Sequence, residues 1–205
     1  REIHHRVKNN LQTVAALLRL QARRMEVPEA RAALQESVRR VASIAMVHET
    51  LSQAFHDTVA FDEIADRVLA MCAEVAAPES TVAVRRTGSF GELPAEVATA
   101  IALVLTELVQ NAVEHACPGP AGGNVVVAAL RSADGLRVEV SDDGVGLPDG
   151  FDLSAGPQLG LKIVRTLVEG ELRGRVGLAT GADGVGTSAV VEVPLSPAAP
   201  PTAEA

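Results

Sequence analysis

Apolar residues recur through the first 25 residues of the chain at intervals of four and three. They stand at positions 3, 7, 11, 14, 18 and 25, and Gln21 fills the one gap. This alternation is typical of the a and d positions of an α-helix that packs along a seam in a helical bundle. The chain begins inside this repeat and without a Met, which we interpret as a fragment of a longer protein.

A second helix is predicted after Pro28, because proline suits the first turn of a helix. Its apolar residues stand at 34, 38, 41, 44, 47 and 51. Two helices joined by a short connector predict an antiparallel helical hairpin over residues 1–57. A lone hairpin leaves both seams half exposed, so we expect two copies to pair as a four-helix bundle in a homodimer.

Residues 58–195 have a different pattern and predict a second domain. Helices are expected at about 61–77, 94–115 and 159–169, and strands at 81–86, 125–131, 136–141, 175–180 and 186–194. Gly, Pro and Asp dominate residues 144–158, which is typical of a loop. The pattern favours an α+β sandwich of helices over one mixed sheet. The Pro- and Ala-rich residues 196–205 are expected to be a disordered tail.

Composition excludes several classes of partner. The formal net charge is −8, which argues against a nucleic-acid partner, since phosphate backbones need a basic face. The chain has no Trp or Tyr and only four Phe, so it lacks residues on which bases stack. We find no apolar run that approaches the roughly 20 residues of a membrane helix and no signal peptide. We therefore expect a cytoplasmic chain without membrane contact.

Two adjacent histidines stand at the head of the first helix. If Ile3 and Val7 occupy the d and a positions, His5 falls at f and points outward, whereas His4 falls at e, on the flank of the seam. A phosphoryl group held on another domain reaches an outward position more easily, which favours His5 as a phosphoryl acceptor and leaves His4 as the alternative. Lys8, one turn further on, could offset the charge of an incoming phosphate.

Glu107 and Asn111 interrupt an otherwise apolar helix. They are four residues apart and therefore share one helical face. The side-chain oxygen of Asn111 suits a hard cation such as Mg²⁺, and Glu107 could orient a water molecule or take part in proton transfer. The alternative is that both residues form the solvated polar edge of a surface helix.

Three glycine-containing segments complete the set of candidate binding residues. Asp142 ends a strand and precedes Gly144 and Gly146, so a carboxylate that could accept from the amine of adenine stands beside a backbone that permits close approach. An ordinary Asp-Gly turn is the alternative. Gly160 lies at a helix N-terminus, where free N–H groups favour an anion; a flexible loop with a helix cap is the alternative. The Thr187 hydroxyl could line a base pocket.

In this order and spacing the segments resemble the N, G1, G2 and G3 boxes of the GHKL ATPase superfamily, which has the Bergerat fold. The segments are Glu107…Asn111, Asp142-x-Gly144-x-Gly146, Gly160-Leu161 and Gly184-x-Gly186-Thr187. The opening Glu2-Ile3-His4-His5-Arg6-Val7-Lys8-Asn9-Asn10-Leu11-Gln12 resembles the H-box of the HisKA_2 subgroup of histidine kinases. The resemblance extends from residue 1 to about residue 195. The related HWE group fits less well, because its signature Trp is absent.

The resemblance implies ATP and Mg²⁺ as cofactors. It implies Mg²⁺ at Asn111, adenine at Asp142, phosphate near Gly160 and Leu161, and Glu107 as the acidic partner in the same box. By the same resemblance His5 is the phosphoryl acceptor, and Asn9 positions water for dephosphorylation. The common H-box has an acid directly after the acceptor, and here that position is Arg6; Glu2, one turn back, is a candidate proton acceptor. The segment between Gly146 and Gly160 is short and has no evident F-box phenylalanine, although Phe151 lies in it.

The function that we expect is ATP-dependent histidine autophosphorylation in a two-component system, followed by transfer to an aspartate of a response regulator receiver domain. One alternative is a GHKL serine/threonine kinase of the anti-sigma-factor type, which has no need for a hairpin opening with His-His-Arg. The other alternative is a non-catalytic dimerisation scaffold.

Overall fold

The structure is a computed structural model of the 205-residue chain. It describes residues 2–28, 58–74, 82–116, 122–148, 150–151, 159–181 and 184–195, with scattered helical positions between 30 and 45. For residues 2–9, 12, 115, 116 and 159 it describes the backbone alone. The predicted tail, residues 196–205, lies outside the described residues.

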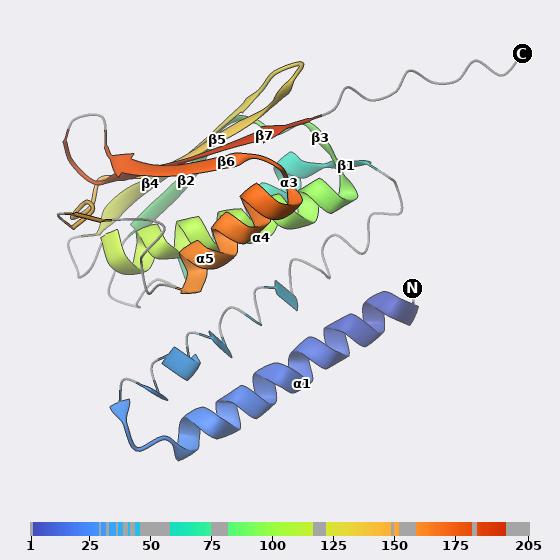
Figure 1. The fold of residues 1–205 in the computed structure, drawn as a ribbon, viewed down its shortest axis with the longest axis vertical. Helices are drawn as coiled ribbons and strands as arrows, with labels where there is room; N and C mark the ends of the chain where they lie inside the picture. Colours follow the sequence, from blue (N-terminus) through green and yellow to red (C-terminus); the bar gives the residue numbers. More distant parts are fainter. Residues whose placement is uncertain are drawn as a thin grey trace, which may run out of the picture.

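After the first long helix and a short strand, each described helix is followed by two strands (Figure 1). In chain order the elements are α1 (Glu2–Arg24), β1 (Thr58–Ala60), α3 (Phe61–Glu74), β2 (Val82–Ser89), β3 (Glu92–Pro94), α4 (Ala95–Asn111), β4 (Gly123–Arg131), β5 (Gly135–Asp142), α5 (Leu159–Arg165), β6 (Arg175–Thr180) and β7 (Thr187–Pro194). Wider π-helical turns extend α4 through Ala112–Ala116 and α5 through Thr166–Glu171.

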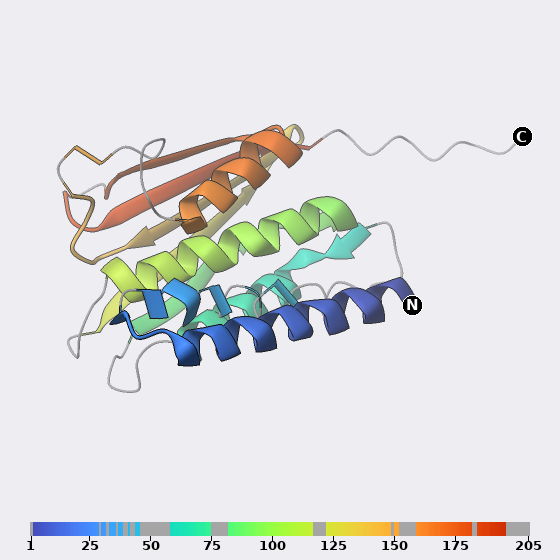
Figure 2. The ribbon, with the colours of Figure 1, turned by 60° about the horizontal axis from the view of Figure 1, so that its bottom comes forward.

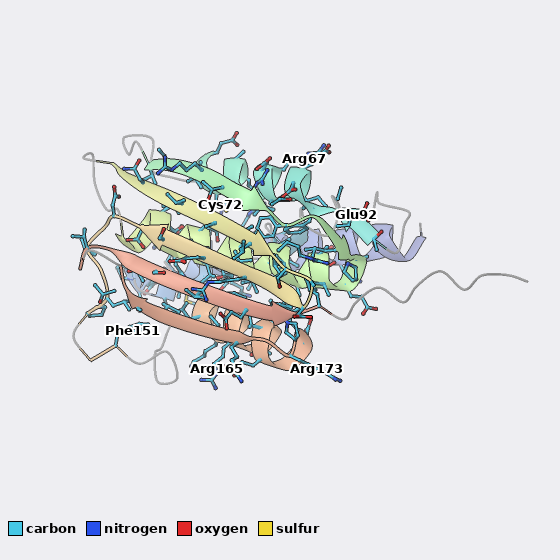
Figure 3. The ribbon with its side chains drawn as sticks, turned by 90° about the horizontal axis from the view of Figure 1, so that it is seen from above. Arg67, Cys72, Glu92, Phe151, Arg165 and Arg173 are labelled. Carbon is cyan, nitrogen blue, oxygen red and sulfur yellow. The ribbon has the colours of Figure 1, made fainter. Side chains whose placement is uncertain are left out.

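Five strands form one mixed sheet in the order β2-β4-β5-β7-β6. Strands β2 and β4 are parallel, and the chain between them contains α4, as a parallel crossover requires. The other neighbouring pairs are antiparallel. Figure 3 shows the five strands side by side, with the helices beneath them. The short strands β1 and β3 form a separate antiparallel pair. The expectation of an α+β fold with one mixed sheet is confirmed.

Helices α3, α4 and α5 pack against one face of the sheet and so make two layers (Figure 2). Alternate residues of β4, β5 and β7 point into this interface, as the two-residue period of a strand requires. They are Val125, Val127 and Ala129, then Leu136, Val138 and Val140, then Ala189, Val191 and Val193. Phe61 and Phe90 meet edge to face, with ring centroids 5.0 Å apart. The core therefore lies between the helices and the sheet.

Helix α1 has one buried face and one exposed apolar face. Ala15 and Ala22 are buried, and Ala22 shares a cleft with Val38 of the second helical segment. Val14, Leu17 and Leu20 are exposed. The predicted seam included Val14 but neither alanine, so the contact inside one hairpin is rotated relative to the seam. Small residues therefore lie on the buried face of α1, while an apolar stripe is exposed on another flank.

Most predicted elements are present within a few residues of their expected bounds. The pair β1 and β3 was not predicted, because three-residue strands are too short to show a period. The expectation that no apolar run approaches membrane-spanning length is wrong. The helix Ala95–Glu114 is long and apolar enough to cross a membrane, judged by length and composition only. In that helix 72 % of the most apolar window is buried, so the same pattern describes a core helix.

Candidate active site

A pocket of about 130 Å³ opens where α4, the end of β5, the start of α5 and the start of β7 meet. Its walls are largely apolar. The residues that line it are Leu108, Asn111, Ala112, Val140, Asp142, Gly146, Leu147, Pro148, Phe151, Leu161, Leu178, Thr187 and Ala189. Five of the predicted binding residues, from four separate segments, are therefore brought together around one cavity.

Asp142 is the only carboxylate that lines this pocket among the described residues. Its Oδ1 accepts hydrogen bonds from the backbone N–H groups of Gly144, at 3.0 Å, and Thr187, at 3.1 Å. Its Oδ2 has no protein donor within the part of the chain that the structure describes. Burial raises the pKa of Asp142, with a smaller contribution from the Asp143 charge, and the two backbone hydrogen bonds only partly oppose this. One oxygen is thus anchored, and the other is available to a ligand.

The backbone after β5, at Gly146, lies close to the backbone before β7, at Gly186, beside Asp142. Gly146 and Gly186 both have positive φ, +77° and +68°. A Cβ on Gly186 would lie 1.9 Å from the Asp142 carbonyl oxygen, and one on Gly146 would lie 3.3 Å from the Gly186 carbonyl oxygen. A side chain at Gly186 therefore has neither the space nor the backbone conformation that it needs. Glycine at this position lets the strand ends of β5 and β7 close around the carboxylate.

Asn111 reaches the same pocket from the last turn of α4. Its Nδ2 is buried and has no hydrogen-bond partner among the described residues. An unpaired buried amide costs free energy, so the side chain is suited to a ligand that supplies the missing contact. The amide oxygen is a hard donor of the kind that Mg²⁺ accepts. Groups of three or more His, Cys, Asp and Glu placed to hold a metal are absent from the described residues.

Glu107 is buried, with 6 % of its surface exposed, and does not line the pocket. The alternative of a solvated polar edge is therefore wrong for Glu107. Burial, followed by the charges of Glu107 and Glu114, raises the pKa of the Cys72 thiol to about 12. The predicted catalytic role of Glu107 stays a prediction.

The remaining predicted binding residues lie in or next to the wall of the cavity. Leu161 lines the pocket and Gly160 is buried beside it at the start of α5. Thr187 contributes both its backbone N–H to Asp142 and a place on the pocket wall. Phe151 packs against the core and lines the pocket as well. The residues directly before α5 lie outside the described set, so phosphate binding near Gly160 stays a prediction.

The three predicted residues of the H-box lie in the first turns of α1. They are His5, Lys8 and Asn9, and the structure describes only their backbone. Helical backbone at these positions agrees with the expected element. The outward orientation of His5 and the choice over His4 stay predictions.

One polar contact at the site was not predicted. The Asp143 carboxylate accepts from the Asn124 backbone N–H and from Asn124 Nδ2, both at 2.6 Å. These hydrogen bonds lower the pKa of Asp143, in contrast to its neighbour Asp142. The adjacent Asp142 and Asp143 in the sequence could have indicated this contact. Successive side chains at a strand end point to opposite sides of the sheet, so the two carboxylates have different partners.

Comparisons with known families agree with this arrangement. Residues 96–197 match the family model described as histidine kinase-, DNA gyrase B-, and HSP90-like ATPase, and residues 2–76 match the HisKA_2 model described as histidine kinase. The fold and pocket thus define an ATPase domain of the GHKL class. Together with the preceding helices, they place the chain in the histidine kinase family, in the HisKA_2 subgroup.

Curated relatives are longer than this chain. The sensor histidine kinase PdtaS of Mycobacterium tuberculosis is 54 % identical over 196 residues, which is 95 % of this chain and 39 % of the relative. The blue-light-activated histidine kinase 2 of Erythrobacter litoralis is 28 % identical, over 95 % of this chain and 56 % of the relative. The chain therefore spans about two fifths to three fifths of these two proteins.

Solved structures share the fold. The histidine kinase domain of the Erythrobacter litoralis EL346 blue-light activated histidine kinase superposes with a TM-score of 0.65 at 28 % identity, over 95 % of this chain and 90 % of that one. The catalytic domain of histidine kinase ThkA has a TM-score of 0.56 at 22 % identity, over 67 % of this chain and 94 % of that one. The second likeness concerns the fold alone.

Proposed function

We propose that this chain is the kinase core of a two-component sensor, which uses ATP to phosphorylate its own His5 and passes the phosphoryl group to an aspartate of a response regulator. The proposal rests on the surroundings of the Asp142 carboxylate. Its Oδ1 is held by two backbone N–H groups, and its Oδ2 is open in an apolar pocket. Such a carboxylate binds a flat, amine-bearing base more readily than it serves the fold.

In this proposal Asp142 accepts a hydrogen bond from the exocyclic amine of adenine. The apolar walls, among them Val140, Leu178 and Ala189, pack against the base. Asn111 would hold Mg²⁺ through its amide oxygen. A bound Mg²⁺ would neutralise charge on the transferred phosphoryl group.

The imidazole of His5 attacks the γ-phosphorus of ATP. A nitrogen–phosphorus bond forms, the bond from the γ-phosphorus to the β–γ bridging oxygen breaks, and ADP leaves with that electron pair. Lys8, one turn from His5, offsets charge on the incoming phosphate. Glu107 is the acidic partner on α4, and Asn9 positions water when the phosphohistidine is hydrolysed. Arg6 follows the acceptor, so a proton acceptor comes from elsewhere, with Glu2 as the candidate.

The proposal also includes the organisation of the chain. Residues 1–57 form the dimerisation and phosphoacceptor hairpin, residues 58–195 the ATP-binding domain and residues 196–205 a disordered tail. The exposed Val14, Leu17 and Leu20 support pairing of two hairpins. The receiver domain docks on the exposed lower half of the hairpin, and the reaction takes place in the cytoplasm.

Labelling with [γ-³²P]ATP and Mg²⁺ separates this proposal from its two alternatives. The expected label is acid-labile and base-stable, as a phosphoramidate is. Acid-stable label on serine or threonine of an added protein would instead support the serine kinase, and absence of any label would support the scaffold. Asn111→Ala is expected to lower labelling by at least about tenfold, because one good metal contact is worth more than ~1.4 kcal/mol. Full labelling in a folded Asn111→Ala protein would overturn the metal assignment.

A further inference from the structure

The contact between Asn124 and Asp143 lies one residue beyond the proposed adenine acceptor. Val125 and Asp142 form the last register pair of the β4–β5 ladder, and Asn124 and Asp143 stand directly after it. Three hydrogen bonds join them: two from Asn124 to the Asp143 carboxylate, both 2.6 Å, and one from the Asp143 backbone N–H to the Asn124 carbonyl oxygen, 3.3 Å. We refer to this set of contacts between Asn124 and Asp143 as the clasp.

The clasp lies on the exposed side of the strands and does not line the pocket. Fold stability alone does not require it, since the β4–β5 ladder is already continuous from Val125 to Arg131. Asn124 is also paired with Ala83 of β2. The clasp therefore connects the turn after β5 to β4 and, through Ala83, to the edge strand β2.

The turn needs such an anchor because its other end is irregular. Asp142 is followed by Gly144 and Gly146, and Gly146 is in the left-handed region, with φ of +77°. Glycine is the most conformationally free residue, so a turn with two glycines is held in one shape only by its contacts. The backbone N–H of Gly144 must stay on Asp142 Oδ1 for Oδ2 to face the pocket.

We infer that Asn124 is a positioning residue for nucleotide recognition: by clasping Asp143 it fixes the direction of the neighbouring Asp142 carboxylate and so sets adenine affinity and selectivity. The inference rests on the proposed function, because it assumes that Asp142 reads the base. The low pKa of Asp143, caused first by the Asn124 side-chain hydrogen bond, agrees with a carboxylate that stays ionised and bound.

A graded set of variants tests the inference through ATP and GTP dissociation constants, measured by calorimetry on the full chain. Asn124→Ala removes one of the two hydrogen bonds to the carboxylate, and Asp143→Ala removes both. We expect the ATP dissociation constant to rise about threefold in the first and about tenfold in the second, as for lost hydrogen bonds to a charged group that is partly solvated. GTP affinity should change less, so the preference for ATP should shrink in the same order.

The exchanged pair N124D/D143N keeps one amide facing one carboxylate and should restore both the ATP affinity and the preference for ATP. Arg137→Ala is the matched control, because Arg137 makes a 2.6 Å ion pair with Glu192 toward the other end of β5 and should leave ATP binding unchanged. Urea unfolding of each variant separates loss of fold from loss of positioning.

Two outcomes overturn the inference. ATP affinity equal to the parent protein in Asp143→Ala would show that the clasp does not position Asp142. Equal losses of ATP and GTP affinity in step with the loss of stability would show a merely structural role. If the parent chain itself binds no ATP, the proposed function fails first, and this result is distinct from the other two.

Discussion

At the scale of single residues, the site depends on opposite environments for two adjacent carboxylates. Asp143 is exposed and hydrogen-bonded by Asn124, which lowers its pKa. Asp142 is half-buried, and burial raises its pKa. A carboxylate whose ionised form is disfavoured in the folded state destabilises the fold at neutral pH, which agrees with the role in base binding that we propose for Asp142.

Asp142→Asn should therefore separate stability from binding. The amide keeps an oxygen for the N–H groups of Gly144 and Thr187 but presents a different group to the base. Because the folded pKa of Asp142 is raised, its contribution to stability is present at low pH and is lost as pH rises through that pKa. We expect equal or higher stability at pH 7 in urea unfolding, with ATP affinity at least about tenfold lower, the value of one hydrogen bond to a charged group. Lower stability with intact ATP binding would contradict this assignment.

Two glycines of the β6–β7 turn give a matched test of close packing. Gly184 and Gly186 both have positive φ, but only a Cβ on Gly186 meets other atoms, at 1.9 Å from the Asp142 carbonyl oxygen. Gly184→Ala should cost about 1–2 kcal/mol, the cost of a left-handed residue with a side chain. Gly186→Ala should cost more and abolish ATP binding. Equal free energies of unfolding for the two variants would show that the close approach has no energetic role.

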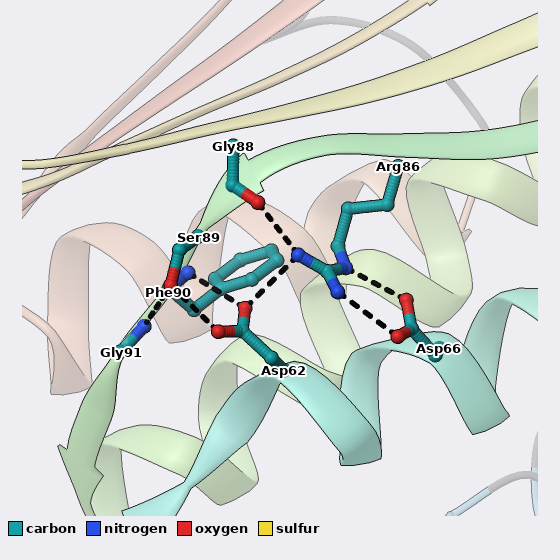
Figure 4. A network of polar contacts seen from close by, with 7 residues as sticks. All are labelled: Asp62, Asp66, Arg86, Gly88, Ser89, Phe90 and Gly91. Atoms are coloured by element: carbon teal, nitrogen blue, oxygen red, sulfur yellow. Dashed lines mark hydrogen bonds and ion pairs between the residues drawn. The ribbon is translucent and has the colours of Figure 1, made fainter.

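At the scale of elements, helix α3 is fixed to β2 by a polar network (Figure 4). The Arg86 guanidinium donates to both oxygens of Asp66, at 2.7 and 2.9 Å, and to Asp62 at 3.1 Å. Asp62 also accepts from the Ser89 hydroxyl and from the Phe90 backbone N–H. Burial raises the pKa of Asp62, but these hydrogen bonds and the Arg86 charge together outweigh it and lower the pKa. The network therefore holds the start of α3 against the end of β2.

Arg86→Ala should destabilise the domain by about 1–2 kcal/mol at pH 7, since Asp66 loses its guanidinium donor and Asp62 keeps only its hydrogen bonds from Ser89 and Phe90. The pKa values of Asp62 and Asp66 are lowered in the folded state, so the network stabilises the protein above pH 4 and the stabilisation is lost as pH falls through the folded pKa values. Urea unfolding at pH 7 and at acidic pH should give a smaller difference between parent and variant at the acidic value. An equal difference at both would exclude an ionic contribution.

The sequence predicted most long elements, because helices and half-buried strands repeat their apolar residues with a clear period. It also predicted four of the residues that line the pocket, namely Asn111, Asp142, Leu161 and Thr187. It missed Phe61 and Phe90 as a packed pair and the Arg86 network, since contacts between residues 20 or more positions apart leave no local pattern. It could not predict that Glu107, four residues before Asn111 on the same helix, is buried and does not line the pocket.

At the scale of the whole molecule, the chain joins a hairpin with an exposed apolar stripe to an ATPase domain. Val14, Leu17 and Leu20 are 44 %, 57 % and 54 % exposed. An apolar stripe of this kind on a helix is favoured when a second helix covers it. Two copies of the hairpin would bury the stripe at their shared seam, as we propose for the homodimer.

Leu17→Glu should weaken that dimer at least about tenfold, because a charge buried at a seam without a partner is costly. Leu130→Glu is the matched control, since Leu130 is 67 % exposed but lies on β4, far along the sequence from the hairpin. Sedimentation equilibrium measures both. A dimer that survives Leu17→Glu, or that is lost in Leu130→Glu, would place the interface elsewhere.

The most direct test of the account is the identity of the phosphorylated residue. The parent chain, His5→Gln and His4→Gln should be incubated with [γ-³²P]ATP and Mg²⁺ and the acid-labile label measured. If His5 is the acceptor, we expect label in the parent and in His4→Gln, and none in a folded, ATP-binding His5→Gln protein. Undiminished label in His5→Gln would contradict it.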